Sequence, residues 1–164
     1  MTVQTLMARL LCGLTLALAG QMAPAVAQVF DRDPRIGYIT AAYAKDAVDH
    51  ARRHFNLALD GSEASIANVE RILAQLSASY RSTVPRPSEE ELSTMAKAYG
   101  SYIGWVFITA RGGEWGTGSL GEGDFSVIRG KTGRMFWPIG YVLKRIRLQS
   151  DRNLKNYYRS MIKN

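Results

Sequence analysis

The stretch Arg111-Gly112-Gly113-Glu114-Trp115 divides the chain into two parts of different character. Before it, apolar residues recur every three or four positions, which predicts helices. After it come short β-type runs separated by glycine, which predict strands. Two adjacent glycines favour the end of a helix at this point. Helices, then a small antiparallel sheet, then further helices together predict an α+β domain.

Two helices are expected in the first part of the domain. The first runs from about Ile36 to Leu59, ends at Asp60-Gly61-Ser62, and carries one apolar face. Ser62 is a good N-cap for the second helix, which runs from Glu63 to about Tyr80. The apolar residues of the first helix are Ala41, Ala44, Ala47, Val48, Ala51, Phe55 and Ala58.

A third helix leads up to the double glycine. Ser88 and Glu91, three residues apart, form a capping box at its start. Gly100 and Gly104 lie four apart, so another element can approach its backbone closely. The run 105–109 is ambiguous, because its residue types favour a strand and its position favours the buried end of a helix.

The part after the double glycine predicts short strands and two helices. Strands are expected around Trp115, at 125–129 and at 134–137, with the turn Gly130-Lys131-Thr132-Gly133 joining the last two as a hairpin. Pro138 opens a helix that ends near Leu148. Ser150-Asp151 is expected to cap a final helix with the apolar residues Leu154, Tyr157, Tyr158, Met161 and Ile162.

Residues 1–27 have the three parts of a cleavable secretory signal. A charged start ending at Arg9 is followed by the apolar run 10–19 and by Ala25-Val26-Ala27. A membrane anchor is the alternative for the run 10–19, but a membrane-spanning helix needs about 20 apolar residues, so a cleaved signal is favoured and no transmembrane segment is expected in the mature chain. Cleavage after Ala27 predicts a single periplasmic or secreted domain, 28–164. A lipoprotein beginning at Cys12 is the less favoured alternative, because Cys12 lies within the apolar run.

Charge is distributed unevenly along the expected mature chain. Residues 28–128 contain 10 basic and 13 acidic residues, net −3, and residues 129–164 contain 10 basic residues and one acidic residue, net +9. Such asymmetry is informative about partners. It predicts a docking face for an acidic protein or for an anionic envelope surface, and the alternative is a solvated helical face. Nucleic acid is not expected as the partner of an exported protein. The candidate partner-binding residues are Lys144, Arg145, Arg147, Arg152, Lys155 and Arg159.

Two glycine motifs have the form of phosphate-binding loops without their context. The run 116–121 matches G-x-G-x-x-G, but the strand-to-helix setting of a dinucleotide site is missing, so a flexible hairpin loop is expected. Gly130-Lys131-Thr132 ends like a P-loop, yet Phe125 stands where that motif needs glycine, so a β-turn is expected.

Asp46, His50 and His54 are spaced by four on the first helix and therefore share one side. Two imidazoles at this spacing can share a zinc ion, so a metal-dependent hydrolase is an alternative function. A third ligand is absent nearby in sequence, and Glu114 could serve only if the fold brought it in. The favoured expectation is that His54 packs at the edge of the core while His50 and Asp46 are solvated. No catalytic residue and no cofactor are assigned, which leaves enzymatic activity open and favours a binding role.

Three motifs between Leu59 and Tyr158 resemble a pattern found in uncharacterised families of exported bacterial domains. They are Gly100-x-Tyr102-x-Gly104, Gly112-Gly113-x-Trp115, and the run 136–146, which begins Phe-Trp-Pro and ends Lys-Arg-Ile. The families often have a glutamate after the second glycine, where this chain has Trp105. Some members resemble immunity or accessory proteins, so the resemblance implies an accessory role. The sequence as a whole predicts an exported binding or accessory module.

Overall fold

The computed structural model describes residues 29–120, 123–148 and 153–163. The predicted α+β class is confirmed. Within these residues none of the helices has the length and apolar character needed to cross a membrane. The predicted signal peptide lies outside the described residues. The elements in chain order are β1 (Phe30–Arg32), α1 (Pro34–Phe55), the 3₁₀ turn η1 (Glu63–Ser65), α2 (Ile66–Ser82), α3 (Glu89–Arg111), β2 (Glu114–Leu120), β3 (Gly123–Arg129), β4 (Met135–Phe136), α4 (Pro138–Leu148) and α5 (Leu154–Ile162).

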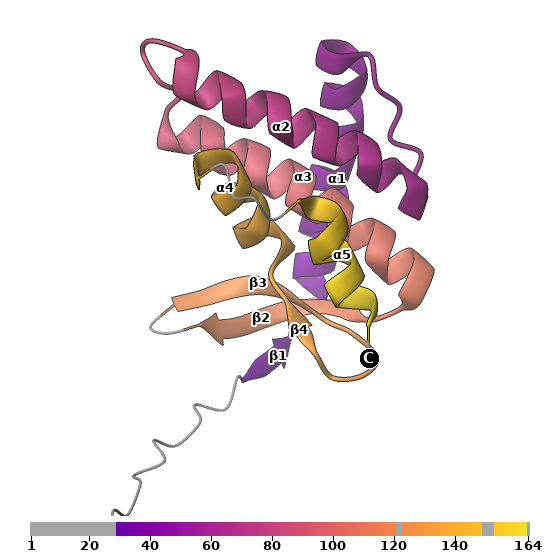
Figure 1. Cartoon of the computed structure of the whole chain (residues 1–164). Helices are drawn as coiled ribbons and strands as arrows, with labels where there is room; N and C mark the ends of the chain where they lie inside the picture. The colour runs from indigo at the N-terminus through magenta and orange to yellow at the C-terminus, as the bar shows by residue number, and fades with distance from the viewer. Residues whose placement is uncertain (1–28, 121–122, 149–152, 164) are drawn as a thin grey trace, which may run out of the picture.

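The four strands form one antiparallel sheet in the order β1-β2-β3-β4, which lies across one end of the helices (Figure 1). β2 and β3 pair along their full lengths, from Glu114 opposite Arg129 to Leu120 opposite Gly123. The predicted hairpin between β3 and β4 is confirmed, because the Gly130 N–H donates to the Arg134 carbonyl at 2.9 Å.

Helix α3 is the centre of the core, with α1 and α4 packed against it. A Cβ atom on Gly100 would lie 2.5 Å from the Ile139 Cα atom of α4, and one on Gly104 would overlap Trp115 and Ile128 of the sheet. The predicted close approach at both glycines is therefore confirmed. The ambiguous run 105–109 is helical and belongs to α3.

The helix ends follow local capping chemistry. Both bonds of the capping box between Ser88 and Glu91 are present, as predicted. The Ser62 side chain accepts a hydrogen bond from the Ser65 N–H, so Ser62 caps the 3₁₀ turn η1 that leads into α2, rather than α2 itself as predicted. The predicted end of α1 was too late, since the helix stops at Phe55 and Asn56 takes the left-handed conformation with φ 51°.

Two features near the chain ends differ from expectation. β1 was not anticipated, and it pairs with residues 116–118 of β2. The Arg129 guanidinium lies 4.1 Å from the ring centroid of Phe30, which holds this short strand against the sheet. Asn153 caps α5 by accepting from the Asn156 N–H at 2.9 Å. The cap predicted at Ser150-Asp151 was therefore wrong, and these two residues lie outside the described ones.

Candidate functional site

The predicted basic face of α4 is divided by the fold, because Arg145 points inward. Arg145 is 9% exposed, and its Nη2 donates to the Glu70 carboxylate of α2 at 2.7 Å. The other Glu70 oxygen accepts from the Leu154 N–H at the start of α5, also at 2.7 Å. One carboxylate thus joins α2, α4 and α5. Because its guanidinium is buried and paired with Glu70, Arg145 is left out of the partner-binding face proposed below, although it was among the predicted partner-binding residues.

The other predicted cations occupy two different surfaces. Lys144 is exposed and has no ion pair within the described part of the chain, and Arg147 pairs with Glu89 at the start of α3. Lys155 and Arg159 are exposed on α5, outside the groove described below. Arg152 lies outside the described residues.

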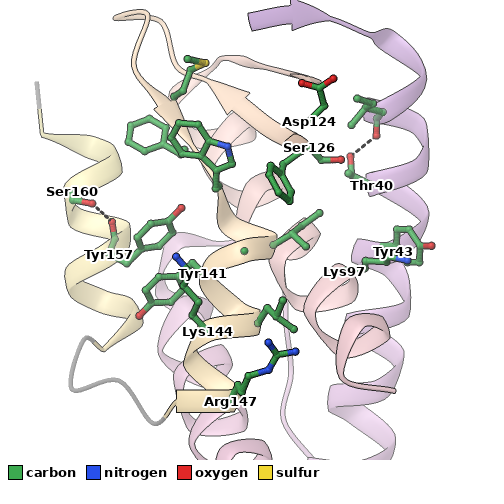
Figure 2. Close-up of a pocket in the computed structure, with 18 of the residues that line it drawn as sticks. Thr40, Tyr43, Lys97, Asp124, Ser126, Tyr141, Lys144, Arg147, Tyr157 and Ser160 are labelled. Atoms are coloured by element: carbon green, nitrogen blue, oxygen red, sulfur yellow. Dashed lines mark hydrogen bonds between the residues drawn. The ribbon is translucent and has the colours of Figure 1, made fainter. Parts of the chain in front are cut away.

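Lys144 and Arg147 line an open groove of about 1340 Å³ (Figure 2). The first half of α1 and the first half of β3 line one side, α4 runs through the middle, and α5 lines the other side. Most of the lining is apolar. It includes Ile39 of α1, Leu143 of α4 and Phe125 of β3, of which Ile39 and Phe125 are 54% and 51% exposed.

Glycines on both sides of the contact between α3 and α4 keep the groove hollow. Gly100 allows the α4 backbone to sit deep against α3, as described above. Gly140 faces the groove, where an added Cβ would meet nothing closer than the Cβ atom of Trp137 at 3.9 Å. On the α5 side, the rings of Tyr141 and Tyr157 stack with centroids 4.0 Å apart, which ties α4 to α5.

The groove has opposite charges at its two ends. Lys144 and Arg147 lie toward the carboxyl end of α4, and Lys97 reaches the groove from α3 (Figure 2). The Lys97 Nζ atom is 5.9 Å from the ring centroid of Tyr43. At the end formed by the sheet, the Asp124 carboxylate accepts from the Ser119 hydroxyl at 2.7 Å. A ligand that follows the groove therefore meets cations at one end and an anion at the other.

The α1 side of the groove was missed by the sequence analysis. Ile36, Ile39 and Tyr43 recur at intervals of three and four, which forms an apolar stripe beside the buried alanines. The same periodicity that defined the core could have found this stripe. The position of this stripe, opposite α4 across the open groove, depends on tertiary packing.

The predicted histidine pair adopts the reverse of the expected arrangement. His50 is partly buried, its Nδ1 lies 2.7 Å from the Tyr99 hydroxyl oxygen, and His54 is exposed. Burial lowers the pKa of His50, and the neighbouring positive charges of His54 and Arg53 lower it further. Asp46 is exposed, as expected.

No cluster of three metal-ligating side chains occurs among the described residues. Glu114, the suggested third ligand, forms ion pairs with Arg32 at 2.8 Å and Arg129 at 2.6 Å. Its carboxylate is therefore engaged at the sheet.

The glycine motif at 116–121 is not the flexible hairpin loop that was expected. Residues 116–120 belong to β2 and pair with β3, and Gly121 lies outside the described residues. Phe30 lies against Gly116 so closely that a Cβ atom there would lie 2.5 Å from its ring. The glycine is explained by this packing.

Comparison with known proteins extends the fold assignment. No family model matches the chain, and no curated protein sequence matches it. A crystal structure from Bacteroides thetaiotaomicron VPI-5482 is similar, with a TM-score of 0.59 and 16% sequence identity over 82% of this chain. This chain spans 47% of the length of that one. At this identity the similarity shows a shared fold.

Proposed function

We propose that the protein is an exported binding module, and that its groove takes an acidic segment of a partner protein. The observation that carries this proposal is an apolar groove that has Lys97 and Arg147 beside it and, on its wall, Lys144, for which the described residues provide no ion pair. The signal-like residues 1–27 support export. The accessory role implied by the sequence resemblance agrees with a binding function.

The size of the groove favours a chain segment over a small molecule. Small-molecule pockets usually measure about 300–1,000 Å³ and enclose their ligand. The groove exceeds that range at about 1340 Å³ and is open to solvent. From Ile139 to Arg147, α4 rises about 12 Å, which about four residues of extended chain would cover. A segment of about eight residues would therefore follow α4 and also reach the sheet.

The shape around the cations favours a protein over a membrane. A lipid surface is broad and attracts cations that protrude together toward it. Lys144 and Arg147 instead line a hollow, and Arg145 between them is buried. An acidic side chain on a protruding segment can enter this hollow, whereas a flat headgroup layer meets mainly its rim.

Fluorescence anisotropy with a defined peptide tests the proposal. The probe is a labelled peptide of about eight residues in which glutamate and valine alternate, and its lysine–valine counterpart is the charge control. We expect the acidic peptide to bind more tightly, and more weakly at high salt because salt screens the charges. Lys144→Glu should weaken binding about tenfold, since it replaces attraction by repulsion and 1.4 kcal/mol corresponds to a factor of ten.

Two matched variants separate the groove from overall charge and from helix stability. Lys155→Glu makes the same charge change on the exposed surface of α5 and should leave the affinity within twofold. Gly140→Leu should block the groove, whereas Gly37→Leu, in α1 where an added Cβ meets nothing within 4 Å, should not. If Lys144→Glu and Lys155→Glu weakened peptide binding equally, the effect would come from the net charge of the protein and not from the groove. Binding to vesicles of phosphatidylglycerol, without binding to the peptide, would contradict the proposal in favour of a lipid surface.

A further inference from the structure

Strand β3 has an open edge because its neighbour β4 is much shorter. β3 runs from Gly123 to Arg129, but β4 pairs only with Ile128 and Arg129. Residues 123–127 pair with β2 on one side. On the other side they have no strand partner within the described part of the chain.

The backbone groups on this open edge can be identified from the hydrogen bonds of the neighbouring strands. The Gly130 N–H donates toward β4, to the Arg134 carbonyl. N–H and C=O groups of alternate residues in an antiparallel strand point to the same side. The backbone groups of Asp124 and Ser126 therefore face away from β2. The Ser119 N–H bond to Val29 agrees, since it directs Ser119 toward β1 and so leaves its partner Asp124 facing the open side.

After β4, the described chain turns away before it can cover this edge. After Phe136 of β4, Pro138 begins α4, and proline has no N–H to offer a neighbouring strand. The helix then leaves the sheet, so the space opposite Ser126 becomes part of the groove. Asp124, Phe125 and Ser126 all line the groove, and Asp124 and Ser126 are visible on its sheet side in Figure 2.

An exposed edge is a template for pairing with another chain, and proteins usually protect it. At the opposite edge of this sheet, β1 covers residues 116–118 of β2. On β3 the open stretch contains no lysine or proline, and its exposed Phe125 adds apolar surface. The one charge on this stretch is Asp124, which disfavours an acidic residue directly opposite it.

We propose that the partner segment binds as an added β-strand on the open edge of β3. Its backbone pairs with the N–H and C=O groups of Asp124 and Ser126, and its acidic side chains lie farther along the groove, toward Lys144 and Arg147. This inference rests on the proposed function, because it specifies how the same groove holds the same segment. Backbone pairing supplies affinity with little dependence on side chains, and the cations select acidic segments.

Amide hydrogen exchange on the full mature protein, with the glutamate–valine peptide, tests the strand. Pairing should slow exchange at Asp124 and Ser126 at least tenfold. Phe125 and Val127, whose N–H groups already face β2, should change little. Peptide binding without slower exchange at Asp124 and Ser126 would overturn the strand while leaving the proposed function intact. Failure of the peptide to bind at all would overturn both.

A backbone variant gives an independent test. Ser126→Pro removes the N–H on the open edge, and the bonds to β2 do not use that N–H. Ser126→Pro should lower the affinity for the peptide at least tenfold more than Ser126→Ala, which keeps the N–H. Exchange protection in the rest of β2 and β3 shows whether the proline variant is folded. Equal affinities of the two folded variants would contradict the inference, and if the proline variant does not fold, exchange in the wild-type protein decides.

Discussion

Replacing Arg145 by alanine should destabilise the protein strongly, because it removes one partner of an inward-facing ion pair. Breaking a buried pair costs about 3–5 kcal/mol. The Glu70 side chain remains 23% exposed and keeps the Leu154 N–H as a donor. Partial hydration and this remaining bond reduce the expected cost to about 2–3 kcal/mol. At about 4 °C per kcal/mol for a domain of this size, the melting temperature should fall by roughly 8–12 °C.

Urea denaturation followed by circular dichroism measures this cost. Lys144→Ala is the matched control, since its side chain is one position away and exposed, and its free energy of unfolding should stay within about 0.5 kcal/mol of wild type. If Arg145→Ala also stayed within that range, the ion pair with Glu70 would not hold the helices together. Arg145 would then return to the set of residues available to a partner.

Three further predictions concern stability. Gly140→Ala should stabilise the protein by about 0.5–1 kcal/mol, because alanine favours the helix and its methyl group enters open space. Gly100→Ala should instead cost about 1–3 kcal/mol, because its methyl group overpacks against α4. Thermal denaturation measures both changes, and equal effects of the two variants would contradict the close packing at Gly100. Burial lowers the pKa of His50 below its ordinary 6.5, so the unfolded state binds more protons between the two pKa values and stability falls as pH drops below about 6.5. His50→Gln should flatten that part of the curve of stability against pH, and His54→Gln should largely keep it. An unchanged curve for His50→Gln would show that His50 does not cause this pH dependence. Tyr102→Phe should cost about 1–3 kcal/mol in urea denaturation, because its hydroxyl bonds Gly61 and Ser65 in the interior, and a cost near zero would show that these bonds are replaceable.

The local parts of the fold could be predicted because short-range chemistry determines them. The capping box at Ser88, the turn at 130–133 and the helix opened by Pro138 each depend on a few neighbouring residues. Strand β1 could not be predicted from residues 30–32, because a three-residue edge strand is stabilised by the sheet it joins. The early end of α1 depends on Asn56, whose tolerance of the left-handed conformation is a known but weak signal.

The candidate site was predicted only in part, because the basic residues were grouped by charge without asking which face of the helix each one occupies. Arg145 lies three residues after Val142 and one before Ile146, both buried, so periodicity already places it on the inner face. Its partner Glu70 is 75 residues away and could not be inferred. For the histidines, the period places His54 nearer the alanine stripe, but Tyr99 of α3 meets His50, and this depends on how the two helices cross.

The groove between α1, β3, α4 and α5 is proposed to receive an acidic segment of a partner protein. The most direct measurement is a map of backbone amide NMR shifts as the glutamate–valine peptide is added to the protein. The largest shifts are expected at Ile39, Ser126, Gly140 and Lys144, which belong to three separate parts of the sequence that meet in the groove. Shifts confined to the exposed surface of α5 around Lys155, with none at those four residues, would contradict binding of the peptide in the groove.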